Sequence, residues 1–405
     1  MSNTIKTLQA GDITRKALAI LHNKLVFCKT INREYDGRFA VSGAKNGGYL
    51  EIREPNQFTV RTGAVMDTQD VTESTTQLVV ATQKGIDINF SSVELTLSMD
   101  DFASRILEPA MSRLAADVDA TVIAGCYPYI YNFENTTLGT KPVLADILAA
   151  RALISKGLAP TSDRVIMLDS LAANSVITDG KSLFHASSEI ERQYSEGQIG
   201  RMGGFTFYES EMTPTHTTGS RTDTTPTVST TVGITSGDAT ITMSGVISGE
   251  TYMAGDIFTI AGVYAVNPET KARYGHLQQF SVTETVTVSG TSDTFEVSPI
   301  PITSGAKQNV EIVTGSATAS VTNLAHGAAS TSYINSLAYH KDAFTMVTAD
   351  LEMPDSGWYA RKVIDGISMR IWRQGDIVND KHPCRIDVLF GYKAIRPEWA
   401  CRICS

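Results

Sequence analysis

The 405-residue sequence lacks several features that would point to a function class. No apolar run reaches the roughly 18 residues needed to cross a bilayer, and the first residues carry no hydrophobic stretch of the signal-peptide type, so we expect folding in a cytosol. The five cysteines are odd in number and scattered, which predicts reduced thiols. Acidic residues exceed basic ones by nine, so no broad basic face is expected to neutralise nucleic-acid phosphates.

The motifs of common enzyme chemistry are also missing. The glycine cluster at 43–48 has no Gly-Lys-Ser/Thr ending and precedes a strand-like stretch, so we interpret it as a flexible tip and not as a phosphate loop. No Gly-x-Ser-x-Gly elbow is present. His185 has Asp179, Ser187 and Glu189 nearby in sequence, but the members of a triad meet in space, and a solvated loop is favoured. We therefore expect no catalytic residues, no cofactor and no enzyme.

One set of residues could bind a metal. His382, Cys384, Cys401 and Cys404 supply four nitrogen or sulfur donors over a span of zinc-site length. However, Cys384 opens an apolar strand, where cysteine acts as a small hydrophobic residue. A redox role for Cys401-x-x-Cys404 is weaker still, because no thioredoxin-like pattern surrounds it. We expect no metal site, and zinc at the two last cysteines stays an open alternative.

Local patterns divide the chain into arms, helices and strands. The segment 36–75 carries two short extended stretches separated by turn residues, which predicts a long hairpin arm. Two strands with so little apolar surface are unstable alone, so the arm must lie on its own domain or on a neighbouring chain. A long amphipathic helix is predicted over 98–125, with Ser98 as its N-cap and Pro109 as the point where it kinks or divides. A second helix over 143–156 leads into the apolar strand 165–168.

The composition changes after Pro214. Thr and Ser dominate 215–235, which predicts a linker or loop-rich boundary, and five or more short strands follow. They suggest a sandwich or barrel of about 100 residues. Because sequence of α/β type stands on both sides of it, we expect an all-β domain inserted into a host of α+β class. Arms and grafted domains are liabilities in a monomer but become interfaces in a closed assembly.

Four stretches resemble the major capsid (coat) proteins of tailed double-stranded DNA bacteriophages, which have the Hong Kong 97-type fold. Residues 95–119 are similar to the passage from strand to spine helix in the peripheral domain, and 196–210 resemble a strand of the axial domain. Residues 255–263 resemble the inserted domain of the short-tailed-phage subgroup, and 386–398 its C-terminal strand. The resemblance implies these divisions: 1–35 N-terminal arm; 36–75 extended loop; 76–130 peripheral domain with its spine helix; 131–220 axial domain, first part; 221–322 inserted β-domain; 323–405 axial and peripheral return with the C-terminal strands.

The function implied by the resemblance is that of a structural subunit of an icosahedral head. Many copies would form pentamers and hexamers, aided by a scaffolding protein and a portal, and would enclose double-stranded DNA without sequence-specific binding or membrane contact. Assembly would take place in the cytoplasm of a bacterial host, and the mature location would be the virion. The candidate inter-subunit residues are Gly43, Lys45, Asn46, Gly47, Gly48, Arg53, Arg61 and Asp238, the last being the only charge in 232–240.

Two alternatives remain open from the sequence. An encapsulin-like compartment uses the same fold, but it would usually be shorter and lack the inserted β-domain. A soluble enzyme or adhesin with a β-module would stay monomeric, whereas a shell protein forms particles.

Overall fold

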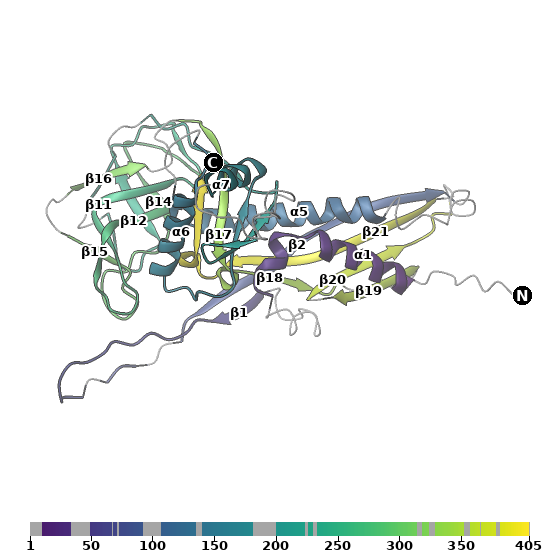
Figure 1. Ribbon diagram of the computed structural model, residues 1–405, viewed down its shortest axis with the longest axis horizontal. Helices are drawn as coiled ribbons and strands as arrows, with labels where there is room; N and C mark the ends of the chain where they lie inside the picture. The colour runs from purple at the N-terminus through teal and green to yellow at the C-terminus, as the bar shows by residue number, and fades with distance from the viewer. Residues whose placement is uncertain are drawn as a thin grey trace, which may run out of the picture. The chain divides into compact units, whose positions relative to one another are not determined.

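The structure is a computed structural model, and its elements form two compact units, each built from separate stretches of chain (Figure 1). The first unit comprises Met1–Arg53, Thr75–Val122 and Thr345–Lys393, and the second comprises Glu54–Ser74, Ile123–Phe344 and Ala394–Ser405. The residues described are 10–33, 49–66, 68–70, 73–91, 107–134, 140–180, 200–222, 226–229, 233–313, 318–323, 329–351, 357–364, 366–377 and 381–404.

The first unit is built on a six-stranded sheet. Its strands run in the order β1-β2-β21-β20-β19, and β18 pairs with β21. One face is apolar, since Ile371 lies opposite Ile386, and the other is polar, since Arg370 lies opposite Asp387. The strands are β1 (Tyr49–Arg53), β2 (Thr75–Ser91), β18 (Phe344–Ala349), β19 (Trp358–Ile364), β20 (Ile367–Arg373) and β21 (Lys381–Ala394).

Among the described residues, the helices that belong wholly or mainly to the first unit are α1 (Ala10–Lys24), α2 (Phe27–Thr30) and α5 (Glu108–Cys126). Helix α1 buries a stripe that includes Ala17, Leu18 and Leu21 and lies against β19 and β20 (Figure 1). An apolar stripe of this kind packs on an apolar surface, which here is the apolar face of the sheet. Helix α5 buries its own stripe at the spacing that the sequence predicted, as Met111, Leu114, Val118 and Val122 show.

The described part of the predicted spine helix is α5, and Leu107 directly before it has π-helical backbone. Pro109 is the second residue of α5; because residues 92–106 lie outside the described residues, the kink or division expected at Pro109 stays a prediction. The predicted N-cap, Ser98, lies outside the described residues.

A buried carboxylate fastens the N-terminal helices to α5. Asp119 of α5 accepts hydrogen bonds from the backbone N–H groups of Val26 (2.8 Å), Phe27 (3.3 Å) and Cys28 (2.9 Å). Burial raises the pKa of Asp119, and these bonds together with one from the Cys28 side chain lower it only in part. A single side chain therefore accepts hydrogen bonds from backbone N–H groups at the start of α2 that have no acceptor within the helix.

The second unit contains a seven-stranded sheet covered by two helices. The order is β3-β22-β17-β4-β6-β5, and β7 pairs with β17. Helices α6 (Leu144–Lys156) and α7 (Ser170–Gly180) pack their apolar residues on it, so the predicted helix at 143–156 and strand at 165–168 are confirmed. The strands are β3 (Phe133–Glu134), β4 (Arg164–Leu168), β5 (Arg201–Met202), β6 (Phe205–Glu209), β7 (Thr215–Thr217), β17 (Ser332–His340) and β22 (Ala400–Cys404).

The same unit contains an all-β barrel, inserted between β7 and β17. Its strands follow the circuit β12-β14-β9-β8-β16-β11, and β11 pairs back with β12, so the barrel closes; β15 adds to β11. Closure removes the free edges that an open sheet would carry. The strands are β8 (Thr227–Ser229), β9 (Thr240–Ser244), β11 (Ile257–Val266), β12 (Arg273–Val282), β14 (Ser292–Ser298), β15 (Val310–Ile312) and β16 (Thr318–Asn323), with a separate pair, β10 (Thr251–Tyr252) and β13 (Val286–Thr287).

These elements confirm the predicted α+β class with an all-β insertion. One sequence interpretation needs correction. The Thr- and Ser-rich stretch 215–235, predicted to be a linker or loop-rich boundary, contains two short strands: β7 pairs with β17, and β8 pairs with β16 and with the nearby β9. The partner of β7 is distant in sequence, as Thr217 opposite Ser332 illustrates, so no local pattern marks that strand.

Candidate functional site

Within the predicted arm 36–75, the stretch Glu54–Ser74, called the extended loop from here on, exposes large apolar side chains. Phe58 is 59% exposed, Val60 96%, Val65 85% and Met66 77%. Several large apolar side chains exposed on one short segment indicate an interaction surface, because covering them removes apolar area from water. The loop is therefore the candidate assembly site.

Hydrogen bonds within the loop hold its shape. The Thr59 backbone N–H donates to Gln69 Oε1 at 2.8 Å, and Gln69 Nε2 donates back to the Thr59 carbonyl at 2.6 Å. Nearer the tip, Arg61 Nη1 donates to the carbonyls of Gly63 and Val65. The two arms of the loop are thus tied together without a regular ladder, which reduces the entropy lost when the loop docks.

The base of the loop is bonded to the barrel. Ser74 Oγ donates to Glu54 Oε2 at 2.9 Å, and Lys307 Nζ approaches Ser74 Oγ at 2.9 Å and Glu54 Oε2 at 3.4 Å. Lys307 stands between β14 and β15, in a barrel loop that Lys271 holds by donating to the carbonyls of Ala306 and Gln308. The barrel thus presents a fixed cation to the base of the extended loop.

The residues predicted at interfaces fall into three groups. Arg53 is exposed at the end of β1, opposite Thr75. Arg61 and Asp238 bond within their own loops: Asp238 accepts hydrogen bonds from the backbone N–H of Thr240 at 3.1 Å and from its hydroxyl at 2.9 Å. The remaining five lie outside the described residues: Gly43, Lys45, Asn46, Gly47 and Gly48.

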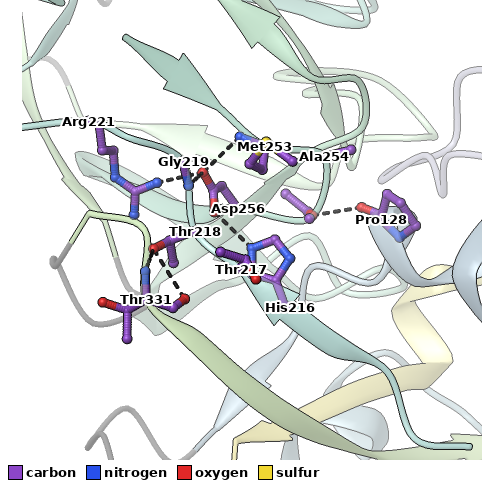
Figure 2. A network of polar contacts seen from close by, with 12 residues as sticks. Pro128, His216, Thr217, Thr218, Gly219, Arg221, Met253, Ala254, Asp256 and Thr331 are labelled. Carbon is purple, nitrogen blue, oxygen red and sulfur yellow. Dashed lines mark hydrogen bonds and ion pairs between the residues drawn. The ribbon is translucent and has the colours of Figure 1, made fainter.

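A network around Asp256 joins the barrel to its host sheet (Figure 2). The buried carboxylate of Asp256 receives His216 Nε2 at 2.8 Å, Arg221 Nη1 at 2.6 Å, and the backbone N–H groups of Met253 at 3.0 Å and Gly219 at 3.2 Å. His216 belongs to β7 of the host sheet, whereas Asp256 immediately precedes barrel strand β11. Burial alone would raise the pKa of Asp256, but the His216 hydrogen bond and the charge of Arg221 hold it below the ordinary value.

A second buried cation completes this joint. Arg402 of β22 donates through Nε to the Ile130 carbonyl at 2.8 Å, through Nη1 to the Gly255 carbonyl at 2.7 Å and through Nη2 to Ser281 Oγ at 2.8 Å. Its guanidinium also lies 4.3 Å from the centre of the Tyr127 ring. We call the Asp256 network and the Arg402 contacts together the barrel joint. Sequence reasoning missed it, although one arginine between apolar residues of a strand is a usable signal.

The structure does not assemble the metal candidate. Cys401 and Cys404 are three positions apart on β22, so their side chains point to opposite faces. Cys401 packs with the α6 and α7 core, and Cys404 packs with Phe133, Ile257 and Tyr333. Burial raises the pKa of Cys404 to about 12, which opposes formation of a thiolate ligand. Within the described ranges no group of three or more His, Cys, Asp or Glu side chains could hold an ion, and no helix there is long and apolar enough to span a membrane.

Comparisons with known proteins address the whole chain. The model of the family described as P22 coat protein, gene protein 5, matches residues 9–402, whereas no curated protein gives a significant match. A solved chain of Mycobacterium phage Che8 aligns at 13% identity and TM-score 0.47, covering 94% of this chain and 90% of that one. A capsid chain of Helicobacter pylori bacteriophage KHP30 aligns at 9% identity and TM-score 0.45, covering 91% and 86%. Because the family match spans almost the entire sequence, the resemblance to phage coat proteins is confirmed: the chain belongs to the P22 coat protein family and is a structural subunit of a phage capsid.

Proposed function

We propose that this coat protein forms the pentamers and hexamers of an icosahedral head that encloses double-stranded DNA. Assembly in the bacterial cytoplasm would use a scaffolding protein and a portal. The observation that carries the proposal is the row of exposed apolar side chains on the extended loop, which a neighbouring subunit would cover. Residues 36–75 would be the arm that reaches this neighbour, and 221–322 the inserted domain that supports its base.

The energetics suit a shell. Covering one fully exposed Val, Phe or Met side chain contributes about 1.5–3 kcal/mol, so each loop supplies a modest association energy. Repetition around a closed surface makes the sum large, because every subunit is held by several neighbours at once. The loop enters such contacts already shaped by its Thr59–Gln69 bonds, which lowers the cost of docking.

The test replaces Phe58 and Val60 together by Ser and counts particles by electron microscopy after expression with the other head proteins. We expect loss of shells while the subunit stays folded by circular dichroism. The matched control is Ile247→Ser, which removes an exposed apolar residue of the barrel and should leave particle yield unchanged. Wild-type particle yield from the double variant would refute the role of the loop. Particles filled with an enzyme instead of DNA would support a compartment.

A further inference from the structure

The N-terminal helical segment has a charge balance opposite to that of the chain. The whole sequence carries nine more acidic than basic residues, yet residues 10–33 contain Asp12 as their only acidic residue. The basic residues of the same segment are Arg15, Lys16, Lys24, Lys29 and Arg33. The segment is therefore locally basic within an acidic chain.

Four of these cations are exposed and have no ion-pair partner among the described residues. Arg15, Lys16, Lys24 and Lys29 are exposed, and none of the four forms an ion pair with any part of the chain that the structure describes. Lys362 of β19, which is also exposed and unpaired within those residues, lies opposite Met369 on the apolar face of the sheet that α1 covers. Other cations of this unit do lie within 4 Å of a carboxylate: Lys84, Arg361, Arg370 and Arg385.

The surface offers charge without apolar anchors. Among the described side chains of α1 and α2, Ala19 is the only exposed apolar one, because Leu18 and Leu21 of α1 and Phe27 of α2 are buried. A protein partner usually needs aromatic or large aliphatic residues at the centre of its interface. A nucleic-acid backbone needs only cations. The composition of the surface therefore favours a phosphate backbone over a protein.

We propose that α1, α2 and the adjoining edge of β19 form the surface through which each shell subunit contacts duplex DNA, by its phosphates and without reading sequence. This inference rests on the proposed function, in which the shell encloses DNA. A 15-residue helix is about 22 Å long, and a duplex of that length carries about 13 phosphate charges. Five cations neutralise a minority of them, so each contact is weak and sensitive to salt, and the duplex can slide during filling.

The test measures binding of unassembled full-length subunit to two fluorescent 24-base-pair duplexes of unrelated sequence, by anisotropy between 25 and 200 mM KCl. We expect equal affinity for both duplexes and a steep loss with salt. The variant Arg15→Gln/Lys16→Gln/Lys24→Gln should bind about tenfold or more weakly, and its log–log salt slope should be shallower by about 0.9 for each cation removed. The control Arg151→Gln/Arg201→Gln/Arg273→Gln removes three cations from the second unit.

The inference is overturned if the wild-type subunit shows no salt-dependent binding to the duplexes, or if the control variant loses as much DNA affinity as the Arg15/Lys16/Lys24 variant. It is also overturned if the Arg15/Lys16/Lys24 variant keeps its DNA affinity but no longer assembles with an acidic head protein, because the surface would then bind a protein. Shell formation is scored on the same preparations by electron microscopy. Shells without DNA affinity would refute this inference alone, whereas a wild-type subunit that never forms shells would refute the proposed function.

Discussion

Each of the two units contains one buried carboxylate that links separate stretches of its own chain, and the two carboxylates have opposite pKa shifts. Asp256 in the barrel joint faces Arg221 and His216, and its pKa is lowered. Among the described residues, the partners of Asp119 in the first unit are backbone N–H groups and the side chain of Cys28, and its pKa is raised because burial outweighs those bonds. Both kinds of donor favour the charged carboxylate, but the partners of Asp256 outweigh the cost of burial, whereas the neutral donors around Asp119 do not.

The largest effect should come from removing the paired carboxylate. Asp256→Ala leaves Arg221 buried without its anionic partner, and such a loss typically costs about 3–5 kcal/mol. We expect the free energy of unfolding, measured by urea titration, to fall by that amount or the protein to become insoluble. Asp238→Ala is the matched control, because Asp238 is an exposed aspartate of the same barrel. Equal stability of the two variants would show that the joint contributes nothing.

Asp119→Asn should have a smaller effect, about 1–3 kcal/mol, because it weakens the bonds to neutral donors without stranding a charge. Its pH dependence separates the two sites. Since the folded pKa of Asp119 is raised above the ordinary 3.8, its contribution to stability is present at low pH and is lost as pH rises. Asp256 has the reverse sign: its contribution is present above pH 3.8 and lost as pH falls through its folded pKa.

The measurement is the free energy of unfolding at several pH values for the wild type and Asp119→Asn. The advantage of the wild type should shrink as pH rises from the acid range towards neutrality. A difference that grows over that range would mean that Asp119 is stabilised as an anion, like Asp256.

The smallest effect on stability is expected from breaking the exposed ion pair between Lys307 and Glu54. Lys307→Gln removes an ion pair with Glu54 in which both side chains are well exposed, and such pairs contribute about 0.2–1 kcal/mol. Global stability should hardly change, but protease cleavage within the extended loop should become faster. Addition of 0.5 M KCl to wild-type protein should have a similar effect, since salt screens exposed pairs. If neither Lys307→Gln nor 0.5 M KCl changes the rate of cleavage, Lys307 does not support the extended loop.

How far the sequence foretold this structure depends on whether the determinants were local. The helix at 143–156, the strand at 165–168 and the all-β insertion were predictable, because apolar periodicity and turn residues specify them locally. The barrel joint was not, because Asp256 meets His216 and Arg221 only after strands distant in sequence have paired. The separation of Cys401 and Cys404 could have been predicted, since positions three apart on a strand face opposite ways.

The pairing of β7 with β17 has a consequence for protein design. Thr217 and Ser332 lie directly opposite each other, so the chain leaves the host sheet and returns to it at the same place. A two-residue turn could bridge that gap and give a minimal coat protein with no barrel at all. Such a truncation would expose His216 and Arg402, so it should fold only if both are replaced by residues that need no partner.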